Sequence, residues 1–156
     1  MRFGVLNSAG ALILLLNATA AQQKSHEPAS ADFRLQTEVS RSVVRAGLPV
    51  TVFANLTNRT ESHWEGIRVA IEAYDEVGNP LAHIEFDGQR FDPQGSKSCK
   101  AVFRFQEPVQ VIIRVTLTHG RSREPFFARD LAARIAVTPL DVAGGSRVSS
   151  DRDGCQ

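Results

Sequence analysis

The sequence predicts an all-β fold, an antiparallel β-sandwich of about seven strands. Apolar and polar residues alternate with a period of two in several short segments between Phe33 and Val137. Stretches rich in Gly, Pro, Asn and Asp separate these segments, and no long helical period stands out. Because one face of each expected strand is apolar, two stacked sheets would bury these faces against each other.

Each expected strand ends at a turn signal or a polar connector. The expected strands cover residues 33–39, 50–56, 67–73, 81–86, 99–105, 109–117 and 127–137. The last segment is ambiguous, because Ala128, Leu131 and Ile135 also share one face of a helix. Phe127, Ile135 and Val137 favour a pleated surface, so we interpret the segment as a strand with Phe127 and Leu131 on its inner face.

Length and charge limit the classes of function. The chain has 156 residues, of which 42% are apolar and 22% charged, as in an ordinary globular domain. Lys and Arg number 18 and Asp and Glu 17, which gives a formal charge of +1. No excess of positive charge is present to neutralise phosphates, so nucleic acid is not expected as a partner.

Residues 1–21 have the layout of a secretory signal peptide. Arg2 supplies a positive start, the apolar run includes Leu12 to Leu16, and Ala18-Thr19-Ala20 provides a small-x-small cleavage pattern. A membrane anchor is the alternative, but the apolar run is about a dozen residues and a spanning helix needs about 20. We therefore expect no membrane span and a secreted or periplasmic protein.

Beyond the signal, composition divides the chain into three parts. Residues 22–32 are expected to be a flexible leader, residues 33–140 the sandwich domain and residues 141–156 a disordered tail. Cys99 falls on an inner face and Cys155 in the tail. An intrachain disulfide, an intermolecular disulfide through Cys155 and an inert buried Cys99 all remain open in an oxidising compartment.

Three stretches carry a resemblance to a known class of module. They are residues 49–58 (PVTVFANLTN), residues 67–75 (IRVAIEAYD) and residues 78–81 (GNPL). Together they resemble the immunoglobulin-like and fibronectin-III-like accessory modules of exported bacterial proteins. The resemblance implies an immunoglobulin-like sandwich and a binding or spacer role, and it transfers no catalytic residue.

His83, Glu85 and Asp87 alternate along the fourth expected strand, where they share one face. His and carboxylates are ligands for divalent metals. The competing interpretation is a solvated edge strand whose charges discourage pairing with another sheet. The sequence indicates no cofactor.

Two loops offer candidate contact residues. His63 and Trp64 precede the third expected strand, where Trp64 either contacts a partner or folds into the core. Arg121 and Arg123 form a small basic loop that either contacts an anion or is a solvated turn. Asn55 and Asn58 each begin a glycosylation sequon, which matters only in a glycosylating host.

The leading functional hypothesis is an exported, non-enzymatic binding or protein-interaction module whose partner is an unknown protein or glycan. The first alternative is a secreted proteinase inhibitor that presents residues 57–65 to an enzyme cleft. The second alternative is a metal-dependent enzyme that uses His83, Glu85 and Asp87. The sequence contains no nucleophile elbow, zinc-protease motif or phosphate-binding loop, which lowers the weight of any enzymatic function.

Overall fold

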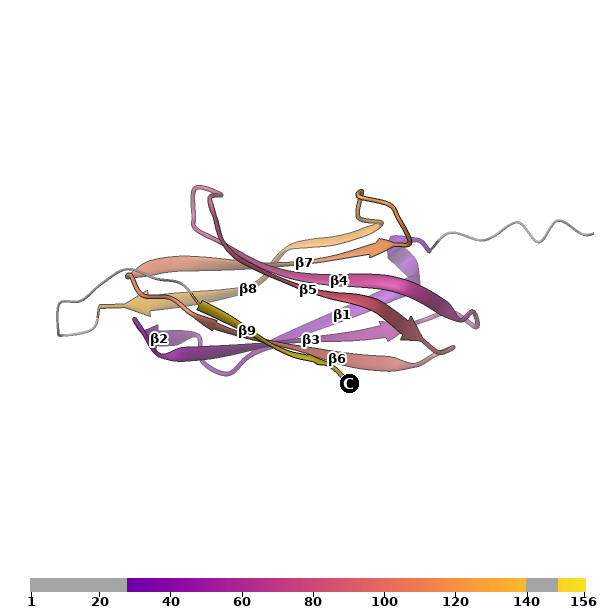
Figure 1. The fold of residues 1–156 in the computed structure, drawn as a ribbon, viewed down its shortest axis with the longest axis horizontal. Coiled ribbons are helices and arrows are strands. Elements are labelled where there is room, and N and C mark those ends of the chain that lie inside the picture. The colour runs from indigo at the N-terminus through magenta and orange to yellow at the C-terminus, as the bar shows by residue number, and fades with distance from the viewer. Residues whose placement is uncertain (1–27, 140–148) are drawn as a thin grey trace, which may run out of the picture.

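The computed structural model describes residues 28–139 and 149–156 (Figure 1). The expected signal peptide, residues 1–21, lies outside the described residues. A 3-10 turn, η1 (Ser30–Asp32), precedes the strands. The strands are β1 (Phe33–Val39), β2 (Val43–Arg45), β3 (Pro49–Asn58), β4 (Trp64–Tyr74), β5 (Pro80–Phe91), β6 (Ser96–Arg104), β7 (Val109–His119), β8 (Phe127–Thr138) and β9 (Ser149–Cys155).

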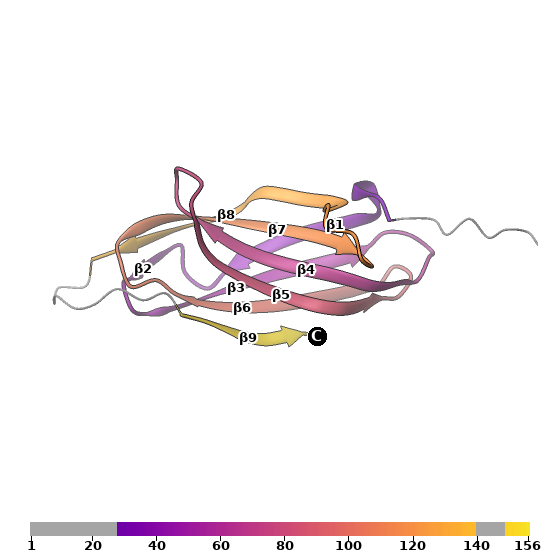
Figure 2. The ribbon, with the colours of Figure 1, turned by 45° about the horizontal axis from the view of Figure 1, so that its top comes forward.

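Two sheets stack as a sandwich, which confirms the predicted all-β, immunoglobulin-like fold (Figures 1 and 2). One sheet has the order β1-β3-β6-β9 and the other β2-β8-β7-β4-β5. In the immunoglobulin scheme β1, β3 and β6 correspond to strands A, B and E, and β4, β7 and β8 to C, F and G. All pairs are antiparallel except β2 with β8, which run parallel. Within the described residues, no helix is long and apolar enough to cross a membrane.

The core lies between the two sheets and follows the period-two alternation. On β3, Val50, Val52 and Ala54 are completely buried, and the residues between them are partly exposed. On β8 the strand interpretation is confirmed, but the register shifts opposite Ile113 and Val115. This irregularity leaves Leu131 51% exposed, so its expected place on the inner face is wrong.

Two strands lie where the sequence predicted none. The short strand β2 forms inside the expected connector before β3. More consequentially, residues 149–155 form β9, so the expected disordered tail is wrong for this part; residues 140–148 lie outside the described residues. β9 pairs with the edge of β6, in the place that strand D holds in many immunoglobulin domains (Figure 2). Backbone pairing with β6 and the disulfide between Cys99 and Cys155 hold this polar segment in place. Because it does not depend on an apolar face, its sequence lacks the period-two alternation from which the expected strands were predicted.

The expected flexible leader is also wrong over residues 28–32. Pro28 is buried, and the Asp32 carboxylate accepts a hydrogen bond from the Ala29 amide at 2.8 Å. The Asp32 carbonyl accepts another from the amide of Arg59, at 2.7 Å. Residues 28–32 therefore belong to the folded domain.

The β4–β5 hairpin closes at the turn that the sequence predicted. The Asp75 carboxylate accepts hydrogen bonds from the amides of Val77 (3.0 Å) and Asn79 (2.8 Å) and from the Asn79 side chain (2.7 Å). Gly78 has a φ of 89°, a conformation that residues with a Cβ rarely adopt. The Asn79 side chain, followed by the backbone amides, lowers the pKa of Asp75 because these donors favour the charged carboxylate.

Asn58, at the end of β3, ties together the loops at one end of the sandwich. Its side chain is completely buried. The amide nitrogen donates to the carbonyls of Ser62 (2.7 Å) and Asp92 (2.9 Å), and the amide oxygen accepts from the amide (3.0 Å) and hydroxyl (2.8 Å) of Thr60. All of its hydrogen-bonding capacity is used within the fold, so a glycan attached here would be incompatible with this structure.

Candidate functional site

The outer face of the five-stranded sheet carries His83 and Glu85, as the alternation predicted. The register places His83 opposite Glu72 of β4. His83 Nδ1 lies 3.4 Å from Glu72 Oε1, and His83 Nε2 lies 3.6 Å from Glu85 Oε2. The imidazole therefore lies between two carboxylates from neighbouring strands.

Arg68 of β4 engages the third residue of the predicted metal set. Its Nε donates to Asp87 Oδ1 at 2.8 Å and lies 3.1 Å from Glu85 Oε1. The hydrogen bond to Asp87, followed by the negative charge of Glu85, raises the pKa of the guanidinium. A register shift between Ile67 and Val69 accompanies this arrangement.

These contacts do not assemble a metal centre from His83, Glu85 and Asp87. Asp87 is directed at the Arg68 guanidinium, whose positive charge would oppose a cation at the same carboxylates. Among the residues that the structure describes, no group of three or more His, Cys, Asp or Glu is arranged to hold a metal ion.

The pairing continues across the sheet to β7 and β8. Arg114 Nε lies 2.9 Å from Asp130 Oδ1, without the alignment of a hydrogen bond, and 3.9 Å from Glu72 Oε2. Acids and bases thus alternate in one continuous line, which we call the charge row. The charge row consists of Asp87, Arg68, Glu85, His83, Glu72, Arg114 and Asp130.

A hollow of about 260 Å³ opens over the charge row. Five members of the charge row line it, all except Asp87 and Asp130, and the remaining lining residues are Ala70 of β4, Thr116 and Thr118 of β7, and Arg123 and Pro125 of the β7–β8 loop. Thr118 Oγ1 is buried without a hydrogen-bond partner in the described residues, and no ion pair of Arg123 occurs within them. An anionic group in the hollow would find an available guanidinium in Arg123.

The two arginines of the predicted basic loop therefore differ in position. Both Arg121 and Arg123 are exposed, but only Arg123 contributes to the lining of this hollow. The candidate site could not be located from the sequence alone because Arg68, Glu72 and Arg114 reach it from strands paired over long separations.

Trp64 is not a surface contact residue. It is only 5% exposed, its Nε1 donates to Thr60 Oγ1 at 3.2 Å, and its ring meets His119 edge-on at 6.1 Å. The contact interpretation is therefore wrong for Trp64, and the core interpretation holds. His63 is exposed, and its Nδ1 lies 3.2 Å from Asp92 Oδ1.

The segment predicted as an inhibitory loop, residues 57–65, is largely strand and bonded turn. Residues 57 and 58 belong to β3, and residues 64 and 65 belong to β4. The intervening turn is anchored by Asn58 and by Gln94, whose side chain donates to the Arg59 carbonyl at 3.0 Å. No extended loop protrudes here to enter an enzyme cleft, so this segment does not support the inhibitor hypothesis.

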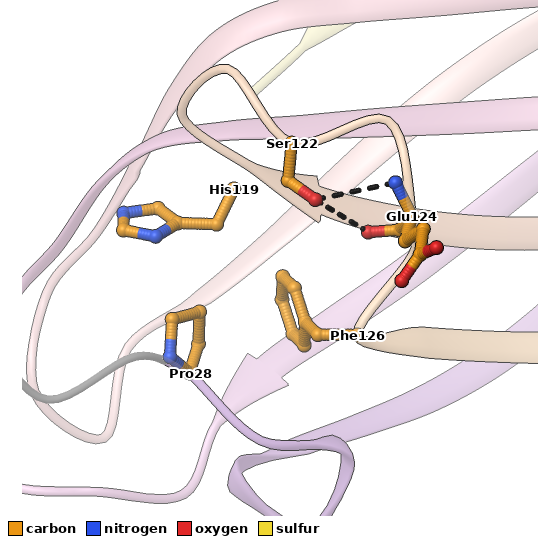
Figure 3. A pocket seen from close by; sticks show the side chains of 5 residues that line it. All are labelled: Pro28, His119, Ser122, Glu124 and Phe126. Carbon is orange, nitrogen blue, oxygen red and sulfur yellow. Dashed lines mark hydrogen bonds between the residues drawn. The ribbon is translucent and has the colours of Figure 1, made fainter.

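A second cavity, of about 90 Å³, lies under the β7–β8 loop (Figure 3). The rings of Pro28, His119 and Phe126 surround it. The Ser122 hydroxyl accepts from the Glu124 amide at 3.2 Å and donates to the Glu124 carbonyl at 3.1 Å. These bonds direct the hydroxyl to the loop backbone and away from His119, so the cavity is a packing corner with no activated nucleophile (Figure 3).

Comparison with known proteins shows similarity in fold only. No protein-family model and no curated protein matches the chain. The C-terminal domain of wzt matches with a TM-score of 0.56 and 7% identity, over 75% of this chain and 78% of that domain. The CARDB domain of the PF1109 protein from Pyrococcus furiosus, solved in complex with di-metal ions, matches with a TM-score of 0.43 and 12% identity, over 75% and 97%.

Proposed function

We propose that this chain is an exported, non-enzymatic immunoglobulin-like module that binds a partner protein through the outer face of its five-stranded sheet, with an anionic group of the partner at Arg123. The observation that carries the proposal is the hollow over the charge row, to whose lining Arg123 contributes an exposed guanidinium that makes no ion pair within the described residues.

The charge row favours binding over catalysis. Each of its carboxylates lies beside an arginine or His83, so the acids are held as ion-pair partners. A rigid surface of fixed alternating charge suits recognition of a partner with complementary charge.

Two features support export. The apolar run from Leu12 to Leu16 is typical of a signal peptide. The disulfide between Cys99 and Cys155 is typical of an oxidising compartment. Expression of the full chain in its host, followed by fractionation and N-terminal sequencing, would test export directly; an unprocessed cytoplasmic product would contradict it.

Arg121 and Arg123 provide a matched pair of variants for the binding test. Immobilised wild-type, Arg121→Glu and Arg123→Glu proteins would be compared as baits for exported proteins of the host. Both variants reverse one exposed charge in the same loop, but only Arg123 lines the hollow. We expect a partner retained by the wild type and Arg121→Glu, released by salt and lost with Arg123→Glu. Equal retention by both variants would contradict the proposed site.

A further inference from the structure

The outer face of the four-stranded sheet presents a different chemistry. In the register, Glu38, Phe53, Lys100 and Gly154 lie in one row across β1, β3, β6 and β9. The next row contains Gln36, Asn55, Ser98 and Gln156, with Ser98 and Gln156 joined by a reciprocal pair of backbone hydrogen bonds. Since Val52 and Ala54, on either side of Phe53, are completely buried, these two rows face outward.

A hollow of about 430 Å³ lies among these rows. Phe53, Ser98, Lys100, Gly154 and Gln156 line it. Phe53 is the only apolar side chain in this lining, and it is partly exposed on the outer face. The site therefore combines one aromatic ring with hydroxyl, ammonium and amide groups.

Gly154 keeps this hollow open. Its φ of 97° occurs where the β6–β9 register shifts between Lys100 and Ala101. A Cβ at this position would meet no atom within 4 Å and would extend into open space. A side chain here would thus narrow the hollow and would also strain the backbone.

The wall contributed by β9 depends on the disulfide. Cys155 stands between Gly154 and Gln156 and is bonded to Cys99, its direct partner in the register. Ser98 and Gln156 exchange backbone hydrogen bonds of 2.9 and 3.0 Å next to the disulfide. The covalent bond therefore fixes two of the five lining residues against β6.

We propose that this hollow is a saccharide-binding site built by docking of β9. A pyranose ring has an apolar C–H face and a rim of hydroxyl groups. The C–H face fits an aromatic ring such as Phe53, and the hydroxyls fit Ser98, Lys100 and Gln156. Because Phe53 is the one apolar side chain in the lining, the hollow cannot bury a largely apolar ligand. It favours a ligand that has one apolar face and polar groups around it. This site is separate from the charge row and does not rest on the function proposed for it.

The direct test is a two-dimensional ¹H–¹⁵N NMR titration of the oxidised protein with cellotriose, chitotriose and trigalacturonic acid as probes. These represent neutral, N-acetylated and acidic saccharides. We expect at least one probe to shift the amide signals of Phe53, Ser98, Lys100 and Gly154, leaving those of β4 and β5 unchanged. Absence of shifts with all three probes, or shifts confined to other strands, would overturn the proposal.

Two variants separate stacking from general damage to the fold. Phe53→Ala should raise the Kd of the saccharide that binds the wild type by roughly tenfold or more, because the aromatic contact is removed. Phe53→Leu keeps apolar bulk without a ring and should also bind more weakly than the wild type. Arg123→Glu, on the other sheet, should leave the saccharide affinity unchanged. Undiminished binding by Phe53→Ala, with a native circular dichroism spectrum, would refute the site.

Reduction tests the part played by β9. After treatment with a phosphine reductant, the probe-induced shifts should disappear while the emission of Trp64, in the other sheet, remains native. Saccharide binding that survives complete reduction of Cys99–Cys155 would refute a site built by the docked strand. If reduction also changes the Trp64 emission, Ser98→Tyr in the oxidised protein replaces this test. It leaves the disulfide and the backbone at Gly154 unchanged, and the added ring should abolish binding by filling the hollow; undiminished binding would refute the site.

Discussion

Substitution of Asn58 by Ala should cost the fold about 3 kcal/mol in free energy of unfolding. The change removes four hydrogen bonds from a completely buried side chain. Each such bond contributes about 1 kcal/mol net, and buried groups left unpaired cost more. The partners on Ser62 and Thr60 lie near the surface, so water would replace part of the loss.

Urea unfolding followed by Trp64 fluorescence measures this effect, because Trp64 is buried beside the same turn. With a typical urea dependence, the midpoint should fall by roughly 1–3 M. Asn55→Ala is the matched control: Asn55 is on the same strand but faces outward, so its replacement should change stability by less than about 0.5 kcal/mol. Equal effects of the two variants, or a loss below about 1 kcal/mol for Asn58→Ala, would refute the reasoning.

Three further predictions concern other parts of the fold. Asp75→Ala should destabilise the protein near neutral pH. Because the pKa of Asp75 is lowered in the folded state, the stabilisation by its carboxylate is lost as the pH falls through that pKa, and the melting temperatures of variant and wild type should converge in acid. Opening Cys99–Cys155, which are 56 residues apart, should lower stability by about 4 kcal/mol, measured by urea unfolding with and without reductant. Trp64 emission should be blue-shifted in the native protein and move to the red on unfolding; emission typical of solvated indole in the native state would contradict its burial.

The sequence predicted most of the core because each core position depends on local alternation. Val50 and Val52 are buried as the pattern indicated. Leu131 was misplaced because an irregularity in the β7–β8 pairing changes which face a residue occupies, and pairing is not visible in one segment alone. β9 was missed for a related reason: its partner is β6, and its polar sequence has no apolar face to reveal it.

The candidate site shows the same division between local and long-range information. The common face of His83 and Glu85 follows from spacing within one strand. The presence of Arg68 beside Glu85 and Asp87 depends on the register of β4 against β5, and Arg114 enters from β7. Since cation and carboxylate come from different strands, only the assembled sheet distinguishes an ion-paired row from a metal site.

The two proposed sites lie on opposite outer faces, with the hydrophobic core between them. The charge row and Arg123 belong to the five-stranded sheet, and the Phe53 hollow belongs to the four-stranded sheet. They share no lining residue, so their perturbations should be independent. Arg123→Glu should therefore lower only the affinity for the protein partner, and Phe53→Ala only the affinity for the saccharide. The double variant should lose each affinity by the same factor as the corresponding single variant. A module arranged in this way could hold a saccharide on one face while a protein occupies the other, which a single shared site would forbid.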